Sequence, residues 1–356
     1  MPRDKHVSNE TPPEKPPRRI SLRRKVLFSL ITVVLFFATA EILLRLGGLQ
    51  LDQRVEKMQF TFPIDDYNSN QPQPFLKRDP QLFWKPTPNV LDHNSQGLYG
   101  PEFSIEKPAG KFRIVCLGDS CTHFGPETYP DMLRAILEKK APGKFEVINA
   151  GVIGYTSFQG RRLWETKVSD WSPDLVTVYF GWNDHWLSIG LEDKEQIASE
   201  PSTAMRWLGS SRVFQFARWL KSGTGTRSSR MRVELPDYKD NLTTIQSQCK
   251  SKAVKTIFLT APHAFNLGIP PYLLTSGEIA NPDDLIPLHN QYNAAVREVA
   301  KATQSTLLDT AQEMESMNKQ ELFIEDHIHL SESGRAYVAN RLMETLEQQG
   351  ILKQSE

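Results

Sequence analysis

The chain lacks the residues that mark several common protein classes. Three cysteines among 356 residues are too few and too scattered for a disulfide framework or a zinc cage. Lysine plus arginine and aspartate plus glutamate number 42 each, so no net charge points to nucleic acid or to an acidic partner. No HExxH sequence or clustered ligand pattern indicates a metal. We therefore expect no metal, no cofactor and no nucleic-acid partner.

One long apolar run stands near the N-terminus. Val26–Ala40 is interrupted only by serine and threonine, Glu41 follows, and apolar residues continue to Leu44. A bilayer core takes roughly 20 residues of helix, so 26–44 is predicted to be a transmembrane signal-anchor helix. A cleaved signal peptide is the alternative, because 38–40 reads Ala-Thr-Ala, which fits a small-x-small cleavage site.

Basic residues directly precede this run, and they predict its orientation. They are Arg18, Arg19, Arg23, Arg24 and Lys25. A cationic flank stays in the cytoplasm, so the polar, Pro-rich and Arg-rich residues 1–25 are predicted to be a cytoplasmic disordered arm. We expect a single-pass cell-membrane protein whose remaining chain lies on the extracytoplasmic side.

The pattern after the anchor changes at residue 111. Residues 45–110 are dense in Pro, Asn, Gln and aromatics, and are predicted to be a lead-in that packs on the domain formed by 111–356. In that domain apolar strands are predicted at 113–117, 145–149, 175–180, 256–260 and 305–309, and helices at 129–140, 159–171 and 335–348. This alternation predicts a parallel five-stranded sheet covered on both faces. Ligands bind such sheets beyond the carboxyl ends of the strands.

A long insertion, 186–252, separates the third and fourth strands. It includes a predicted amphipathic helix, whose candidate apolar contacts are Met205, Trp207, Leu208, Phe214, Phe216 and Trp219. A Gly- and Ser-rich tract follows at 222–230. The favoured interpretation is an additional helix that covers the core, followed by a solvated loop. The alternative is a mobile lid whose apolar side borders a substrate cleft.

Polar groups that suit acyl transfer follow three of the predicted strands. Ser120 comes after Gly-Asp, and a serine nucleophile requires a base and a stabilised oxyanion. The backbone N–H groups of Ser120 and Gly151 and the side-chain amide of Asn183 are candidate oxyanion donors. Each residue taken alone is also explained by a structural role: a helix N-cap for the serine, a turn for the glycine and a cap for the asparagine.

The candidate base lies near the C-terminus. His329 follows Asp326 by three residues, a spacing that lets the carboxylate hold one ring nitrogen while the other faces the serine. His327 is the rival, but at this spacing it points away from Asp326. Four residues after the third and fourth strands are tentative substrate-binding residues, with simple packing as the alternative: Trp182, Asp184, His185 and His263. His123 has the same status.

Together these segments resemble the four blocks of the SGNH hydrolases, also called GDSL esterases. The matching blocks are Gly118-Asp119-Ser120-Cys121-Thr122, Gly151, Gly181-Trp182-Asn183-Asp184 and Asp326-His327-Ile328-His329. The resemblance covers about residue 111 to the C-terminus without the insertion. It implies a flavodoxin-like three-layer α/β/α sandwich, catalytic Ser120, Asp326 and His329, and an oxyanion hole from Ser120, Gly151 and Asn183. Cys121 stands where the family usually has leucine.

The anchor and lead-in are similar to those of bacterial membrane-attached members of that family, which implies a periplasmic or cell-surface location. We expect a serine ester hydrolase that cleaves a carboxylic, short-acyl (for example acetyl) ester through an acyl-serine. The expected partners are a small-molecule or glycan ester of the cell envelope or exterior, and the membrane that holds the N-terminal helix. One alternative is an O-acyltransferase that uses the same serine. The other is a non-catalytic surface binding protein.

Overall fold

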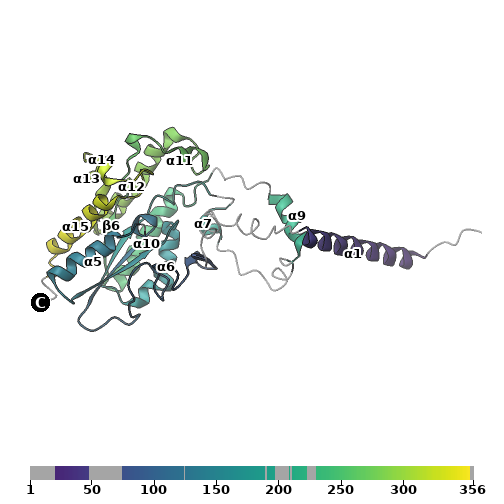
Figure 1. The fold of residues 1–356 in the computed structure, drawn as a ribbon, viewed down its shortest axis with the longest axis horizontal. Coiled ribbons are helices and arrows are strands. Elements are labelled where there is room, and N and C mark those ends of the chain that lie inside the picture. Colours follow the sequence, from purple (N-terminus) through teal and green to yellow (C-terminus); the bar gives the residue numbers. More distant parts are fainter. Residues whose placement is uncertain are drawn as a thin grey trace, which may run out of the picture.

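The structure, a computed structural model, describes residues 21–47, 74–123, 125–188, 191–196, 208, 211–222 and 230–352. Figure 1 shows an α/β sandwich and, apart from it, a long helix α1 (Leu22–Leu46) that meets a shorter helix α9 (Arg212–Ser222). The predicted cytoplasmic arm up to residue 20 and the lead-in residues 48–73 lie outside the described part of the chain.

A five-stranded sheet forms the middle layer. Its strands are β3 (Phe112–Gly118), β4 (Phe145–Gly151), β5 (Leu175–Tyr179), β6 (Lys255–Leu259) and β7 (Thr306–Leu308). Their order is β4-β3-β5-β6-β7, and all neighbouring pairs are parallel. Side chains alternate between the two faces of a strand: Val115 and Leu117 of β3 enter one core, and Ile114 and Cys116 enter the other. The predicted parallel sheet is therefore confirmed, and burial on both faces explains why its strands are apolar throughout.

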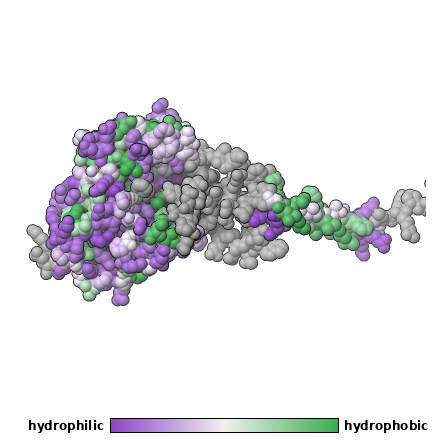
Figure 2. Space-filling model, viewed as in Figure 1, coloured by the Kyte–Doolittle hydropathy of each residue, from purple (hydrophilic) through white to green (hydrophobic). Residues whose placement is uncertain are grey.

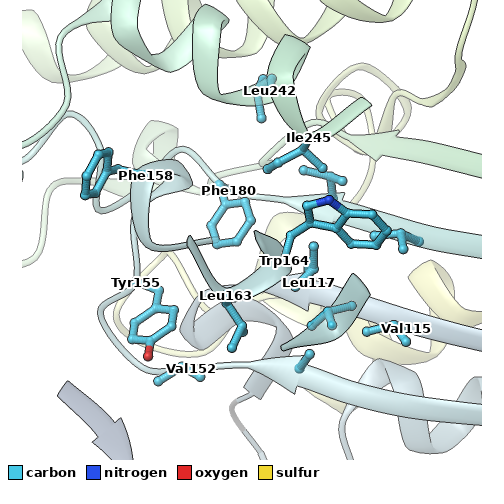
Figure 3. Packing of buried hydrophobic residues seen from close by; sticks show 14 of the residues in the cluster. Val115, Leu117, Val152, Tyr155, Phe158, Leu163, Trp164, Phe180, Leu242 and Ile245 are labelled. Atoms are coloured by element: carbon cyan, nitrogen blue, oxygen red, sulfur yellow. The ribbon is translucent and has the colours of Figure 1, made fainter. Parts of the chain in front are cut away.

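Helices cover both faces and complete three layers. One face carries α6 (Ser157–Thr166), α10 (Leu235–Ser251) and α12 (Leu285–Thr303); the other carries α5 (Tyr129–Lys140) and α15 (Glu332–Gln348). Figure 3 shows Trp164 of α6 beside Leu117 and Ile245, deep in the first core. Trp164 is only 1% exposed, so truncation to alanine is expected to cost about 3–5 kcal/mol.

Two predicted helices have different bounds in the structure. The helix expected at 159–171 begins at Ser157, because the Thr156 side chain caps its first turn in a capping box with Gln159. It ends at Thr166, and a separate 3-10 turn, η1 (Val168–Trp171), follows. Helix α15 starts at Glu332, three residues early, because the Ser331 hydroxyl caps it by accepting the Gly334 N–H.

Short helices lie in the loops between the main strands and helices. They are α4 (Ser120–His123), α7 (Asp193–Gln196), η2 (Phe265–Leu267), α11 (Pro271–Thr275), η3 (Pro282–Asp284), α13 (Thr310–Glu313) and α14 (Lys319–Leu322). Most of them follow the carboxyl ends of strands, where the polar residues of the candidate site also lie.

The described part of the lead-in packs on the sandwich through an antiparallel hairpin of β1 (Leu76–Asp79) and β2 (Phe83–Pro86). Trp84 is fully buried, and its ring N–H donates to Ile153 O at 3.0 Å. The Tyr155 hydroxyl donates in turn to Trp84 O at 2.7 Å. These contacts fasten the hairpin to the loop after β4.

The insertion divides into two parts in the structure. Its last part forms α10, which is a regular crossover helix of the sandwich between β5 and β6. Its earlier helix, α9, packs against the end of α1. Neither interpretation of the insertion, a helix that covers the core or a mobile lid over the cleft, predicted this contact. Met205 and Trp207 lie outside the described residues, and α9 contains Phe214 and Phe216.

Helix α1 is long and apolar enough to cross a membrane. Its large apolar side chains are exposed, among them Val34 at 64% and Phe36 at 67%. Figure 2 shows them as a hydrophobic band with hydrophilic residues at both ends. A helix that belonged to a soluble core would bury one side of this surface.

Candidate active site

The register of the sheet brings three strand ends to one level. Gly118, at the end of β3, pairs with Gly151 of β4 and with Tyr179 of β5. Helix α4 then packs directly on these ends. A Cβ atom at Gly118 would lie 2.0 Å from the Thr122 hydroxyl oxygen, and one at Gly151 would lie 2.7 Å from Thr122 Cβ. Both glycines are therefore required for the close approach of α4, which begins at Ser120.

Ser120, His329 and Asp326 form a continuous hydrogen-bonded row. His329 Nε2 lies 2.7 Å from Ser120 Oγ, and His329 Nδ1 lies 2.5 Å from Asp326 Oδ2. Because a carboxylate accepts a proton donor, Nδ1 carries the ring hydrogen and Nε2 is left to accept the serine proton. The side chains of His329 and Asp326 remain 19% and 23% exposed, so a substrate can approach the row.

The loop around Asp326 fixes the direction of this carboxylate. Its Oδ1 accepts the backbone N–H groups of Ile328 at 2.9 Å and His329 at 2.8 Å. Partial burial alone would raise the pKa of Asp326, but the hydrogen bonds and charge of His329, together with these N–H groups, outweigh it and lower the pKa below its ordinary value. The carboxylate is therefore ionised at neutral pH, as an orienting group for an imidazole must be.

The structure brings His329, and not His327, to the serine. His327 adopts a left-handed backbone conformation with φ of 60°. Its Nδ1 lies 2.6 Å from Gly268 O, in the loop after β6. The turn at His327 reverses the chain so that Ile324 N–H can donate to His329 O at 3.0 Å. The two histidines therefore face different partners.

Asn183 reaches the same edge from the loop after β5. One N–H of its side-chain amide donates to Asp119 Oδ2 at 3.2 Å, which leaves the second N–H for an incoming oxygen. Asp119 is 1% exposed, and its Oδ1 accepts the Cys121 N–H at 2.8 Å. Burial raises the pKa of Asp119 to about 6. Our sequence analysis missed this orienting role, although Asp119 stands inside the Gly-Asp-Ser segment.

The backbone N–H of Gly151, a candidate oxyanion donor, already has a hydrogen-bond acceptor in the structure. It donates to the Asn149 side-chain oxygen at 2.9 Å. The amide nitrogen of Asn149 donates to Thr122 O at 3.0 Å and to Thr128 Oγ1 at 3.2 Å, so this side chain is firmly held. The expected oxyanion donor thus has an internal acceptor, because Asn149 lies two residues earlier on the same strand and turns its amide toward the strand end.

Comparison with known proteins places the chain in a family. Residues 116–337 match the GDSL-like Lipase/Acylhydrolase family. The chain belongs to this family. It is therefore a hydrolase of ester bonds, with the α/β/α fold that the four sequence blocks implied.

Individual relatives of this GDSL-like hydrolase are distant. An uncharacterized lipoprotein, YqeF, of Bacillus subtilis is 30% identical over 92 residues, which span 24% of this chain and 37% of the relative. Among solved structures, a lipase/acylhydrolase from Enterococcus faecalis is 18% identical with a TM-score of 0.46, over 67% of this chain and 96% of that one. An acetylxylan esterase from Geobacillus stearothermophilus, Axe2, is 19% identical with a TM-score of 0.44, over 65% and 93%.

The tentative substrate-binding residues of this GDSL-like hydrolase lie in its interior. His289 Nε2 lies 2.6 Å from Ala261 O, and the other nitrogen of that ring lies 3.0 Å from His185 Nε2. The Trp182 ring stacks on His289 with centroids 3.8 Å apart. His263 is 8% exposed, and its Nδ1 accepts the Phe265 N–H at 3.2 Å. Burial lowers the pKa of His185 to about 3 and that of His263 to about 4, so both rings are neutral.

Asp184, the fourth of these residues, belongs to a buried polar network that joins several loops. Its Oδ1 accepts the Ser157 N–H at 2.9 Å and the Ser157 hydroxyl at 2.6 Å. Burial raises its pKa to about 7, despite these hydrogen bonds. The contacts of all four residues fit the packing alternative. His123 is also internal, with Nδ1 3.2 Å from Gly151 O.

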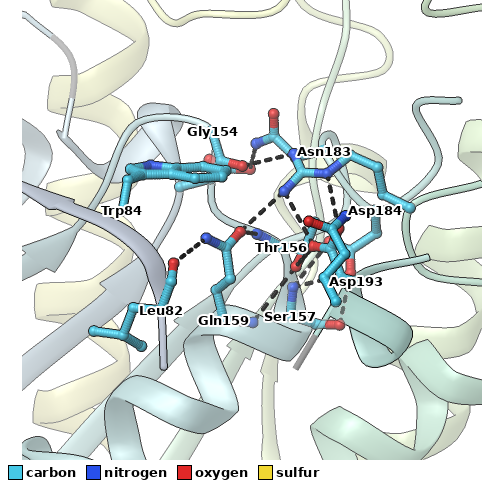
Figure 4. A network of polar contacts seen from close by, with 12 residues as sticks. Leu82, Trp84, Gly154, Thr156, Ser157, Gln159, Asn183, Asp184 and Asp193 are labelled. Atoms are coloured by element: carbon cyan, nitrogen blue, oxygen red, sulfur yellow. Dashed lines mark hydrogen bonds and ion pairs between the residues drawn. The ribbon is translucent and has the colours of Figure 1, made fainter. Parts of the chain in front are cut away.

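Arg232 is the cation of this network, which Figure 4 shows around Thr156, Gln159 and Asp193. It donates to both carboxylate oxygens of Asp193 at 3.3 and 3.1 Å, to Gly154 O at 2.7 Å and to Gln159 Oε1 at 3.0 Å. The guanidinium also lies 5.6 Å from the centroid of the Trp84 ring. The network therefore fastens two parts of the insertion, at Asp193 and Arg232, to the lead-in hairpin and to the start of α6.

Proposed function

We propose that this GDSL-like hydrolase acts through an acyl-serine, with Ser120 as nucleophile, His329 as base and Asp326 as orienting carboxylate. One observation carries the proposal: the imidazole bridges the serine oxygen at 2.7 Å and the carboxylate at 2.5 Å. These distances suit proton transfer, and the partial exposure of the row suits access by an ester.

In this mechanism the Ser120 oxygen attacks the ester carbonyl while its proton passes to His329 Nε2. The resulting oxyanion accepts the Ser120 N–H and the free N–H of Asn183. As the tetrahedral intermediate collapses, the C–O bond to the alcohol breaks and the alcohol takes the proton from His329. A water then repeats the attack on the acyl-serine, and the carboxylic acid leaves.

The third oxyanion donor is Gly151, whose N–H would turn from, or be shared with, the Asn149 oxygen when substrate binds. Each donor is typically worth ~3–4 kcal/mol of barrier. The Ser120 N–H is at the first position of α4 and so has no acceptor within its own helix. Ser120 and Asn183 thus form a usable pair before Gly151 contributes.

We also propose that the natural substrate is a short-acyl ester on a cell-envelope or extracellular glycan. A long acyl chain needs an apolar channel beside the nucleophile. Two cavities that the described residues line are found elsewhere: one between the hairpin and η1, with Leu82 and Trp171, and one beside α5, with Arg134 and Phe145. Ser120 Oγ contacts the polar ring of His329, and the Asn183 amide lies at the same edge of the sheet, bonded to Asp119.

The location of the protein is the third part of the proposal. The exposed apolar surface of α1 supports a single membrane span at 26–44, with 1–25 in the cytoplasm. The lead-in 45–110 and the hydrolase domain 111–356 then lie in the periplasm or on the cell surface, where envelope glycans are within reach of a tethered enzyme.

A fluorophosphonate probe and an ester panel test this function on the full chain in detergent. We expect the probe to label the wild-type protein and not Ser120→Ala, and acetyl esters to turn over faster than long-chain esters. Labelling of Ser120→Ala would mean that another residue is the nucleophile.

p-Nitrophenyl acetate, offered with and without an acetyl-free oligosaccharide, separates hydrolysis from transfer. We expect acetate as the main product in both mixtures. Acetylated sugar as the main product would identify an O-acyltransferase, and a wild-type protein that neither reacts with the probe nor cleaves any ester would support a binding role.

A further inference from the structure

Glu41 lies in the last turns of α1, and a carboxylate is costly beside lipid. In the structure it is fully engaged. Oε1 accepts the Arg212 N–H at 3.0 Å and Arg45 Nε at 2.7 Å. Oε2 accepts the Ser211 hydroxyl at 2.9 Å and the Val213 N–H at 3.0 Å. Glu41 therefore caps the first turn of α9 from a helix 170 positions away in the sequence.

The sequence of α9 is amphipathic. Four residues fall on one side at helical spacing: Val213, Phe216, Ala217 and Leu220. The opposite side has the positions of Gln215 and Arg218, with Phe214 and Lys221 at its border, and the helix contains no Asp or Glu. A basic amphipathic helix of this kind suits the boundary between lipid headgroups and acyl chains.

The position of α9 along α1 indicates what surrounds the apolar side of α9. Ala40, Glu41 and Leu44 are partly covered, whereas residues 22–39 of α1 are exposed. The bilayer that surrounds the exposed part of α1 must end near the charged pair of Glu41 and Arg45, which is the level at which α9 lies. At that level the apolar positions of α9 are within reach of the acyl chains around the anchor, and the basic positions in its sequence suit anionic headgroups.

We propose that α9 is a second membrane contact of this hydrolase, held by Glu41 against the extracytoplasmic end of α1 and occupied by anionic lipid headgroups. This inference rests on the proposed anchoring of α1. It assigns the early part of the insertion to the membrane surface rather than to the substrate cleft.

Lipid contact is measurable with a fluorescent label on α9 in the full chain. Ala217 is exposed, and the three native cysteines are buried, so a maleimide reporter of polarity reacts at Ala217→Cys. Thr243→Cys, on the exposed side of α10, is the matched control. In nanodiscs of phosphatidylcholine and phosphatidylglycerol, we expect brominated acyl chains to quench the label at 217 and to leave the label at 243 bright. Equal quenching at both positions would overturn the proposal.

The charge on the lipid and the carboxylate on α1 are then varied in turn. In discs of phosphatidylcholine alone, the ratio of docked to undocked α9 should fall roughly fivefold for each basic side chain that contacts headgroups. Glu41→Leu removes the cap and should lower the quenching at 217, while Glu41→Gln keeps one acceptor oxygen and should lower it less. Quenching that is the same in wild type and Glu41→Leu would overturn the role of Glu41.

Further readouts distinguish a failure of this inference from a failure of the proposed anchor or of the proposed hydrolase function. Release of the whole chain from vesicles by an alkaline wash would mean that α1 is not an anchor, whereas a retained chain with an unquenched label at 217 defeats only the inference. Energy transfer between labels on different copies, without lipid quenching, would assign the apolar side of α9 to a second copy and overturn the lipid contact. Fluorophosphonate labelling of Ser120 reports the hydrolase function independently of the anchor, of the lipid contact and of any contact with a second copy.

Discussion

Two segments of this hydrolase place an aspartate and a histidine at the carboxyl edge of the sheet, yet they differ in chemistry. Asp326 and His329 are partly exposed, and hydrogen bonds lower the pKa of Asp326. Asp184 and His185 are buried; burial raises the pKa of Asp184 to about 7 and lowers that of His185 to about 3. Burial and partners, rather than residue type, therefore decide which pair can move a proton.

The partners explain the contrast. The Asp326 carboxylate receives a ring nitrogen and two backbone N–H groups, and the same ring reaches Ser120. Among the described residues, the Asp184 carboxylate receives only the N–H and hydroxyl of Ser157, and His185 faces another buried ring, His289. The first pair is arranged for proton transfer and the second for holding loops together.

The largest expected effect comes from the first pair. His329→Ala should lower kcat for p-nitrophenyl acetate by roughly 10⁴–10⁶, because the serine loses its base. His327→Ala is the matched control in the same loop, since its ring contacts Gly268 O and not Ser120; it should lose less than about tenfold in kcat, the effect of losing one hydrogen bond. Similar losses in the two variants, measured on folded protein, would refute the assignment of His329.

Exchanging each aspartate for asparagine compares the pairs directly. Asp326→Asn should lower kcat/KM by roughly 10⁴, because an amide no longer holds the imidazole in the required tautomer. Asp184→Asn should change kcat/KM by less than about tenfold, since its contacts do not reach Ser120. Steady-state kinetics at neutral pH, with circular dichroism as the check on folding, decide the matter; a greater kinetic loss from Asp184→Asn would reverse the two assignments.

The buried network should affect stability more than rate. Arg232→Met leaves the fully buried Asp193 without its cation and should cost about 3–5 kcal/mol of unfolding free energy. Thermal denaturation of the full chain in detergent measures this loss. The double variant Arg232→Met with Asp193→Leu should regain part of it, because no unpaired charge is then buried; a double variant less stable than the single one would contradict this account.

The smallest expected effect is a pH slope from Asp184. Its folded pKa of about 7 exceeds the ordinary value of 3.8, so the folded state binds the proton more tightly. This stabilisation is fully present below pH 3.8 and is lost as the pH rises toward 7, by at most about 1.4 kcal/mol per pH unit. The melting temperature of wild type relative to Asp184→Asn should therefore fall between pH 5 and pH 7. A difference that stays constant or rises over this range would contradict the raised pKa.

Local patterns were enough to predict the sheet and the positions of its ends. The strands of this fold are short apolar runs, and glycine or polar residues follow them because helix α4 and its neighbours must approach closely there. Ser120 and Asn183 were singled out for that reason, whereas His329 was singled out for its spacing from Asp326. The spacing of Asp326 to His329 also fits the turn that the structure shows at His327.

Contacts between distant residues were not predictable in the same way. The hydrogen bond from the Gly151 N–H to the Asn149 side chain depends on the rotamer of the asparagine, which no sequence pattern predicts. His289 stacks on Trp182 from a helix more than 100 positions later. The first turn of α9 is capped by Glu41, which the sequence presents only as an interruption of an apolar run.

The hydrogen bonds of Glu41 bear on the length of the proposed membrane span. Glu41 lies inside the proposed span 26–44, a helix about 28 Å long at 1.5 Å per residue, and its carboxylate is already bonded to Ser211, Arg212 and Val213. A typical hydrocarbon core is about 30 Å thick. The proposed span therefore nearly matches the hydrocarbon core, although a carboxylate stands inside it, because α9 supplies the hydrogen-bond donors that lipid lacks.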